Sequence, residues 1–199
     1  MLEVLEELPE KLDDLYGRMM RQIRNLKRRN PEFCRLVLST VAVAYRPLHL
    51  VELAIVSGLP PEIFAGHMNR VREVVALCGL FLTVKENIVY VIHQSVKDYL
   101  SSRTAPTAFP SGTNQAHHTI FARSIQALSP ILRRNIYNLS YPGITVDNVT
   151  SPRPDPLASL RYSCIHRASH FCDASSGKSS FKSEDLERIG QLIRSTFLY

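Results

Sequence analysis

Apolar residues recur at helical spacing along residues 1–78 and predict four helices. The first spans residues 8–26, and its apolar face consists of Leu8, Leu12, Leu15, Met19, Ile23 and Leu26. Acidic residues cluster near its start and basic residues near its end, which complements a helix macrodipole. Three further helices are predicted over 33–44, 50–57 and 61–78, because prolines and glycines separate these apolar stretches.

A run rich in β-forming residues follows Gly79, which ends the fourth helix. Residues 80–84 and 88–92 are predicted strands, and Glu86-Asn87 between them suits a tight turn because Asn tolerates left-handed backbone. Residues 94–100 begin another helix. Helices followed by one hairpin are typical of a winged helix. The sequence therefore predicts a mainly α fold with one small β-hairpin, of the α+β class.

Composition divides the chain into three parts. Residues 1–101 are the predicted winged-helix domain with its N-terminal helix, 102–114 are a linker, and 115–199 are a helical segment. In that segment, helices are predicted over 115–128, 157–171 and 184–199, with a proline-rich, loop-like stretch between the first two. The last helix stops at Tyr199 without a cap, which predicts a segment truncated at its C-terminus.

The chain has 199 residues, of which 45% are apolar and 21% charged, as in an ordinary globular protein. Cys34 and Cys78 lie in apolar periodic segments and are expected to be buried thiols. The absence of a dense disulfide framework favours a reducing compartment. The N-terminus turns acidic, unlike a signal peptide. The longest apolar run, 36–45, is too short for a bilayer, so we expect a cytoplasmic protein with no membrane contact.

Several motifs in the first half resemble one region of large fungal NLR-like proteins. The stretches LPEKLDDLY (8–16) and AYRPLHLVELA (44–54) resemble the part that follows the NACHT ATPase core in STAND NTPases of the heterokaryon-incompatibility type. The stretches LCGLFL (77–82) and VIHQSVKDYL (91–100) are similar to the wing and closing helix there. Such domains are often labelled winged helices of the GPI inositol-deacylase type, a name that implies no deacylase activity.

Motifs in the second half are similar to the segment between that winged helix and the C-terminal repeats of the same proteins. They are RNIYNL (134–139) and DPLASLRYSC (155–164). The resemblance therefore extends over nearly the whole chain. It is specific in the combination of its motifs rather than in any single one.

The resemblance implies a non-catalytic regulatory module of a fungal NACHT-type signal-transduction NTPase. In such switches the winged helix packs on the nucleotide-binding core and holds the resting state, and C-terminal ankyrin or WD repeats sense a ligand. The implied partners are that core and those repeats. We expect no cofactor in this chain, since ATP or ADP would be bound only through a NACHT core. Gly177-Lys178-Ser179 is merely the tail of a phosphate loop, so we expect no enzymatic activity.

The resemblance also singles out His93 as a candidate site. In related signalling NTPases, a histidine at the end of the wing approaches the β-phosphate of ADP, and His93 occupies that place here. A histidine can donate a hydrogen bond to phosphate. The alternative is that His93 caps the next helix or packs at the base of the wing.

DNA binding is a rival interpretation, because a winged helix can lay its second long helix in a major groove. The predicted helix 61–78 offers His67, Asn69, Arg70 and Arg72. Glu62 and Glu73 dilute this positive charge, and the net charge of the chain is only +6. The sequence therefore disfavours nucleic acid as a partner.

The sequence also disfavours a metal site and a nucleophilic site. Cys164, His166, His170 and Cys172 are good ligand types, but on a helix Cys164 and His166 lie about 200° apart and cannot converge. We therefore expect no metal. Ser95 follows His93 by two residues, and we expect the two side chains to face apart rather than to form a catalytic pair.

A last alternative is that the short chain stands alone. It would then be an adaptor, or a relic of a truncated gene, and would act by binding another protein. A winged helix without its ATPase core would expose the apolar patch that it normally buries, so it would bind a partner or self-associate.

Overall fold

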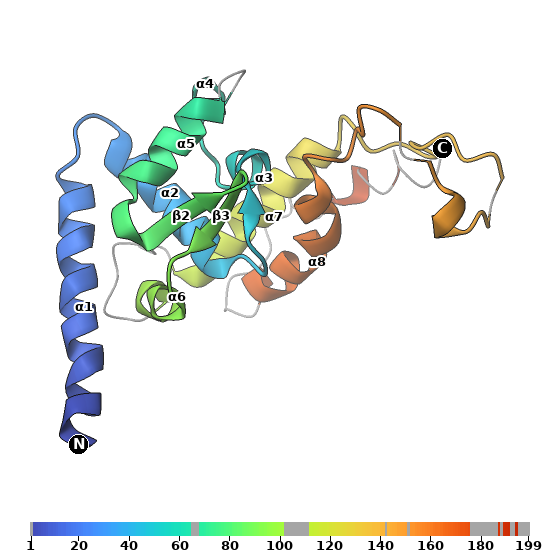
Figure 1. Ribbon diagram of the computed structural model, residues 1–199. Coiled ribbons are helices and arrows are strands. Elements are labelled where there is room, and N and C mark those ends of the chain that lie inside the picture. Colours follow the sequence, from blue (N-terminus) through green and yellow to red (C-terminus); the bar gives the residue numbers. More distant parts are fainter. Residues whose placement is uncertain are drawn as a thin grey trace.

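The computed structural model describes residues 2–64, 68–101, 112–141, 143–150, 152–175, 187, 189–191 and 194. This part is mostly helical and contains one small antiparallel sheet (Figure 1), so the predicted α+β class is confirmed. The elements are α1 (Leu2–Arg24), α2 (Asn30–Val43), β1 (Leu48–His49), α3 (Leu50–Val56), α4 (Pro61–Phe64), α5 (Met68–Leu77), η1 (Gly79–Phe81), β2 (Leu82–Lys85), β3 (Ile88–Val91), α6 (Gln94–Ser101), α7 (Thr113–Leu128), η2 (Val146–Asn148) and α8 (Arg161–Ser175).

The sheet has three strands in the order β1-β3-β2, one more than the predicted hairpin. The short strand β1 pairs Leu48 with Val89, and its two residues are too few to show a period of two in the sequence. The predicted Glu86-Asn87 turn is confirmed, because both residues have positive φ, at 50° and 64°. Two central residues with positive φ match the right-handed twist of a tight hairpin.

Several predicted boundaries were wrong by a few residues. The first β-strand of the hairpin begins at Leu82, because Gly79 (φ 64°) turns the chain into the 3₁₀ helix η1. Helix α8 begins at Arg161 rather than at 157, since the Asp155 carboxylate accepts a hydrogen bond from the Leu157 N–H and holds a turn there. Helix α7 begins at Thr113, inside the predicted linker.

Other predictions fall partly outside the described residues. The helix predicted over 61–78 is described as α4 and α5, and residues 65–67 between them, His67 included, lie outside the described part. Most of the linker 102–114, the Gly177-Lys178-Ser179 stretch and most of the last predicted helix also lie outside it. The division into domains therefore stays a prediction.

The main core is centred on α2. Val37 and Leu38 of this helix are fully buried, as are Val71 on α5 and Phe81 in η1. Cys34 and Cys78 also have no exposed surface, so the prediction of two buried thiols is confirmed. Burying a side chain of the size of Leu38 contributes about 2 kcal/mol, so this helix anchors the first hundred residues.

Helix α7 lies between two groups of elements. It contacts α2 and α3 on one side and α8 on the other (Figure 1). Ile120 belongs to the main core, whereas the next residue, Phe121, belongs to a second cluster with Ile125, Leu128 and Leu160. The second half of the chain is therefore packed directly onto the first.

Helix α1 contacts the body through its C-terminal half. Tyr16, Met20 and Ile23 are buried, and the Tyr16 ring lies 5.7 Å from Phe81 and 5.2 Å from Tyr99 between ring centroids. The N-terminal half of the helix projects past the other elements (Figure 1). Tyr16 thereby places α1 beside η1 and α6.

Candidate functional site

His93 lies between β3 and α6, where the sequence placed it. Its ring is exposed, and its Nδ1 atom accepts a hydrogen bond from the Ser95 N–H at 3.2 Å. Its carbonyl accepts from the Val96 N–H at 3.0 Å. This is the geometry of a residue that caps a helix N-terminus. Capping, the alternative interpretation of His93, is therefore realised in the structure.

The structure corrects the expected separation of His93 and Ser95. Ser95 Oγ lies 2.7 Å from His93 Nδ1, so the two side chains meet. The reason is that His93 precedes the helix and has no helical backbone, so the 100° rotation per residue does not apply to it. Ser95 Oγ also lies 2.7 Å from the hydroxyl of Tyr16 on α1. The signal in the sequence is the two-residue spacing at a helix start, which also suits capping.

The contact does not form a catalytic pair. Ser95 is part-buried and shares its hydroxyl with Tyr16 as well as with His93. Within the described part of the chain, no carboxylate contacts the His93 ring to orient it as a general base. A nucleophilic serine needs both a free approach and an oriented base. The geometry therefore suits positioning of the histidine rather than attack by the serine.

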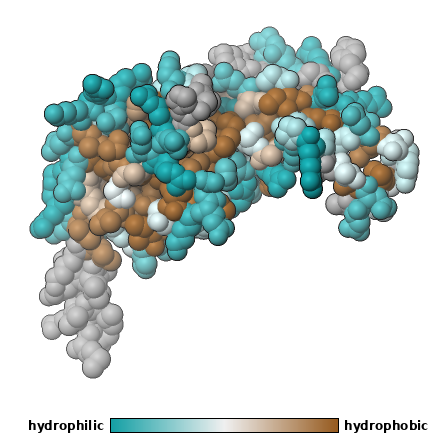
Figure 2. All heavy atoms as spheres, turned by 45° about the horizontal axis from the view of Figure 1, so that its top comes forward, coloured by the Kyte–Doolittle hydropathy of each residue, from teal (hydrophilic) through white to brown (hydrophobic). Residues whose placement is uncertain are grey.

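Three exposed apolar side chains are next in sequence to residues that form or contact this site. Leu80 is 70% exposed and precedes Phe81, whose ring contacts Tyr16. Ile92 is 50% exposed and precedes His93. Leu15, next to Tyr16 on α1, is also exposed. Figure 2 shows apolar atoms gathered on the part of the body beside α1. We call Leu15, Leu80 and Ile92 the wing-base patch. Such a patch is typical of a surface that another protein covers.

A hollow of about 250 Å³ lies beside the start of α6. It is lined by the end of α2, the loop after it, β3 and α6, with residues Val41, Arg46, Pro47, Val89, Tyr90, Val91, Gln94 and Lys97. The Lys97 ammonium group donates to the Ala44 carbonyl, and Arg46 is held by Glu52. Both cations are already engaged, so this hollow is not a preformed anion site.

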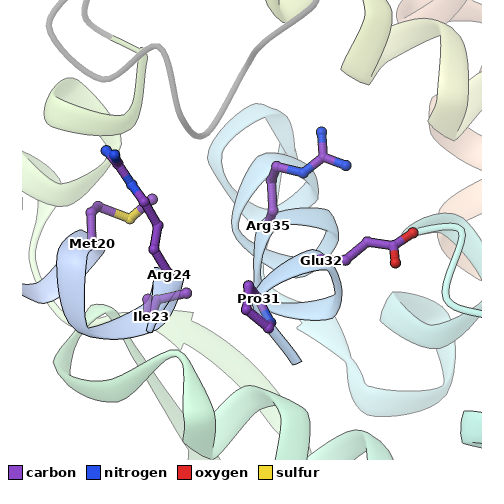
Figure 3. Close-up of a pocket in the computed structure, with 6 residues that line it drawn as sticks. All are labelled: Met20, Ile23, Arg24, Pro31, Glu32 and Arg35. Carbon is purple, nitrogen blue, oxygen red and sulfur yellow. The ribbon is translucent and has the colours of Figure 1, made fainter. Parts of the chain in front are cut away.

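A smaller hollow lies between α1 and α2 (Figure 3). Met20, Ile23 and Arg24 line it from α1, and Pro31, Glu32 and Arg35 line it from α2. Glu32 is paired with Arg29, which lowers the pKa of the Glu32 carboxyl. The other charged groups of this hollow are Arg24 and Arg35, and a guanidinium is always protonated, so neither the paired carboxylate nor the two arginines is a nucleophile or a base.

A buried carboxylate fixes the start of α8. Glu52 is 4% exposed and accepts two hydrogen bonds from Arg46, at 2.7 and 2.9 Å. It also accepts from the backbone N–H of His49 at 3.0 Å and of Tyr162 at 3.1 Å. Burial alone would raise the pKa of Glu52, but these donors outweigh it and lower the pKa.

A second polar cluster, which the sequence did not reveal, joins α7 and α8 to the first half. His170 is fully buried, with its Nε2 atom 2.7 Å from the Tyr162 hydroxyl and its Nδ1 atom 2.8 Å from Nδ1 of His117. The Tyr45 N–H donates to the Tyr162 hydroxyl, and the Tyr45 hydroxyl donates to Asp173. We call these residues the histidine cluster. No motif links positions so far apart in sequence.

Burial governs the protonation of the histidine cluster. It lowers the pKa of His170 to about 4, and the positive charges that His117 and His166 can carry add to this shift. Burial also lowers the pKa of His117, whereas it raises the pKa of Tyr162 to about 12. The histidines and tyrosines of the cluster are therefore uncharged at neutral pH.

The structure also bears on the metal and nucleic-acid interpretations. Among the described residues, no three His, Cys, Asp or Glu side chains are grouped as a metal site requires. His166 and His170 do share a face of α8, since both rings contact Tyr45. On α5, the Arg72 guanidinium donates to the Asn87 side chain in the hairpin turn at 2.6 Å. The expected absence of a metal and of nucleic acid stays a prediction.

No helix in the described part of the chain has the length and apolar character needed to cross a bilayer.

Comparison with known proteins identifies one curated relative, the vegetative incompatibility protein HET-E-1 of Podospora anserina. The two sequences are 39% identical over 191 residues, which cover 90% of this chain and 14% of that protein. The chain is therefore related to one region of a fungal incompatibility protein and spans a small part of its length. No family model matches the chain, and no solved structure matches it significantly.

Proposed function

We propose that this chain is a regulatory region of a fungal NACHT-type signalling NTPase: a winged helix followed by the helical segment that precedes the C-terminal repeats. The observation that carries the proposal is the 39% identity to HET-E-1, which spans nearly the whole of this chain. The order of elements supports it, because two helices flanking β1 precede α5 and a hairpin that closes a three-stranded sheet. The motifs that resemble the winged-helix region coincide with those elements.

In this proposal the region acts by packing and carries out no chemistry of its own. The wing-base patch docks on the nucleotide-binding core and holds the resting state. His93 lies at the edge of the same patch and donates a hydrogen bond to the β-phosphate of ADP bound by that core. The nucleotide belongs to the core, the repeats sense the ligand, and the protein works in the cytoplasm.

A chimaera tests this function. The matched region of HET-E-1 is replaced by this chain, and the incompatibility reaction is scored with and without His93→Ala. The proposal predicts that the chimaera gives the incompatibility reaction only when the ligand of the repeats is present. The His93→Ala chimaera should give the reaction without that ligand, and should retain less ADP when purified. Lys85→Ala is the control, since Lys85 is also exposed, lies at the end of β2 and is outside the patch. Unchanged regulation and ADP retention in His93→Ala would contradict the role of His93.

The size of the gene product tests the larger claim. An antibody raised to this chain should detect a band several times heavier than the 22.5 kDa of the chain in lysates of the source cells. A band near 22.5 kDa would contradict the proposal and would turn the search to a separate binding partner.

A further inference from the structure

The hydrogen bonds around His93 determine which ring nitrogen carries the proton. A backbone N–H can only donate, and the Ser95 N–H points at His93 Nδ1 at 3.2 Å. Nδ1 must therefore present its lone pair. In a neutral imidazole the proton then resides on Nε2, which is the nitrogen away from the helix.

The same reasoning sets the direction of the next two hydrogen bonds. Since Nδ1 carries no proton, the 2.7 Å contact with Ser95 Oγ requires the serine hydroxyl to donate. The Ser95 proton is then used, so the Tyr16 hydroxyl must donate in the other 2.7 Å contact, to Ser95 Oγ. The result is a chain of donors that runs from Tyr16 on α1 through Ser95 on α6 to His93.

We infer that Ser95 and Tyr16 are positioning residues for His93: the Ser95 N–H fixes the imidazole proton on Nε2 and the two hydroxyls hold the ring in place, so that the exposed ring offers one N–H donor to an anionic oxygen. The tautomer follows from the contacts alone. The identity of the anion as a phosphate of ADP rests on the proposed function. Because Tyr16 belongs to α1, a displacement of α1 would release Ser95 and weaken the hold on His93.

The packing around Tyr16 makes this chain of donors specific. Its ring is 7% exposed and lies against Phe81 and Tyr99, so the hydroxyl is held at one position. Fixed donors of this kind reduce the freedom that a ligand must remove when it binds. A histidine on a freely rotating side chain would offer either nitrogen to the ligand.

Nitrogen-15 NMR of the imidazole rings tests the tautomer in the chain itself, at a pH where His93 is neutral. The inference predicts that His93 has Nε2 protonated and Nδ1 as an acceptor, with its resonances assigned by their loss in His93→Asn. In Ser95→Ala one donor to Nδ1 is removed, and Tyr16→Phe removes the donor behind it. Both variants should shift the Nδ1 resonance of His93, Ser95→Ala the more strongly.

Ser39→Ala is the matched control, because the Ser39 hydroxyl donates to a carbonyl within α2, away from this site. Its spectrum should leave the His93 resonances in place. A proton on Nδ1 in the unaltered chain would overturn the inference. So would an unshifted Nδ1 resonance in a folded Ser95→Ala chain.

The HET-E-1 chimaera separates this inference from the proposed function. If both hold, Ser95→Ala lowers the affinity for ADP about fivefold, the effect of one lost hydrogen bond. Adding Ser95→Ala to His93→Ala should then lower it no further. A shifted Nδ1 resonance with unchanged ADP affinity would support the positioning role and contradict the phosphate contact.

Discussion

Glu52 accepts a hydrogen bond from the backbone N–H of Tyr162, 110 positions further along the chain, at 3.1 Å. The same carboxylate closes the capping box of α3, so one side chain satisfies donors at the start of two helices. A negative charge is favoured at both helix N-termini. This carboxylate fixes α8 against α3, and it does so from the beginning of both helices.

Replacing Glu52 by Gln should therefore destabilise the chain by roughly 2 kcal/mol. The amide NH₂ group of the variant would face groups that can only donate hydrogen bonds, and Arg46 would lose its ion-pair partner. Urea denaturation measures the change in the free energy of unfolding. Glu32→Gln is the matched control, since Glu32 forms an exposed pair with Arg29 and should cost less than about 0.5 kcal/mol. Equal effects of the two variants would contradict this account of Glu52.

Acid should weaken the packing of α8 through His170. The folded chain keeps His170 neutral down to a pKa of about 4, whereas an unfolded chain binds the proton near the ordinary value of about 6.5. Between these values the unfolded state holds more protons, so stability falls as the pH falls and is fully present above about pH 6.5. The loss at pH 4 should reach about 3 kcal/mol.

Unfolding free energies measured across this pH window test the assignment to His170. His170→Gln should flatten the profile, with lower stability throughout because the Tyr162 contact is altered. The depressed pKa of His117 leaves a smaller slope of the same sign in that variant. A profile that remains as steep without His170 would show that another group controls the acid response.

A charged substitution in the wing-base patch should leave the stability of the isolated chain unchanged but should disturb the regulation of the chimaera. Ile92→Asp places a carboxylate where we propose that the nucleotide-binding core packs, so the chimaera should react without its trigger. Ile165→Asp is the matched control, because Ile165 is 65% exposed on α8 and lies outside the patch. Thermal melting of the isolated chain should show both variants close to the parent. Identical behaviour of the two chimaeras would remove the patch from the mechanism.

Glu86→Gly should raise the free energy of unfolding by about 0.5 kcal/mol. Glu86 has φ 50° and is exposed, and glycine adopts positive φ without the strain that a Cβ brings. Lys85→Gly, one residue earlier and within β2, should lower it instead, because glycine weakens a strand. Chemical denaturation measures both changes in the free energy of unfolding. Changes of opposite sign would support the turn geometry, and a lower free energy of unfolding in both variants would contradict it.

The features of this structure that depend on neighbouring residues in the sequence could be predicted. The helical periodicity around Cys34 and Cys78 predicted their burial, and the Glu86-Asn87 pair predicted the turn, because each rests on neighbours in the sequence. The two-residue strand β1 could not be foreseen, since its assignment depends on pairing with Val89, which lies 41 positions after Leu48.

The same distinction applies to the two sites: His93 depends on its local sequence, and the histidine cluster depends on residues far apart in the chain. The position of His93 follows from its place after the wing, but the predicted separation from Ser95 is wrong, because a capping residue has non-helical backbone and the helical rotation per residue does not apply to it. The histidine cluster was missed altogether. His117 and His170 are 53 positions apart, and only the packing of α7 against α8 brings them together.

The position of α7 between two groups of helices has a consequence for how the chain could be divided. Ile120 completes the core of the first half, and Phe121 completes that of the second. Of two polypeptides encoded separately, one ending at Ser101 would lack Ile120, and one beginning at Gly112 would lack Ile55, which packs against the second cluster. They should therefore assemble with each other by fragment complementation, as two halves of a split protein do.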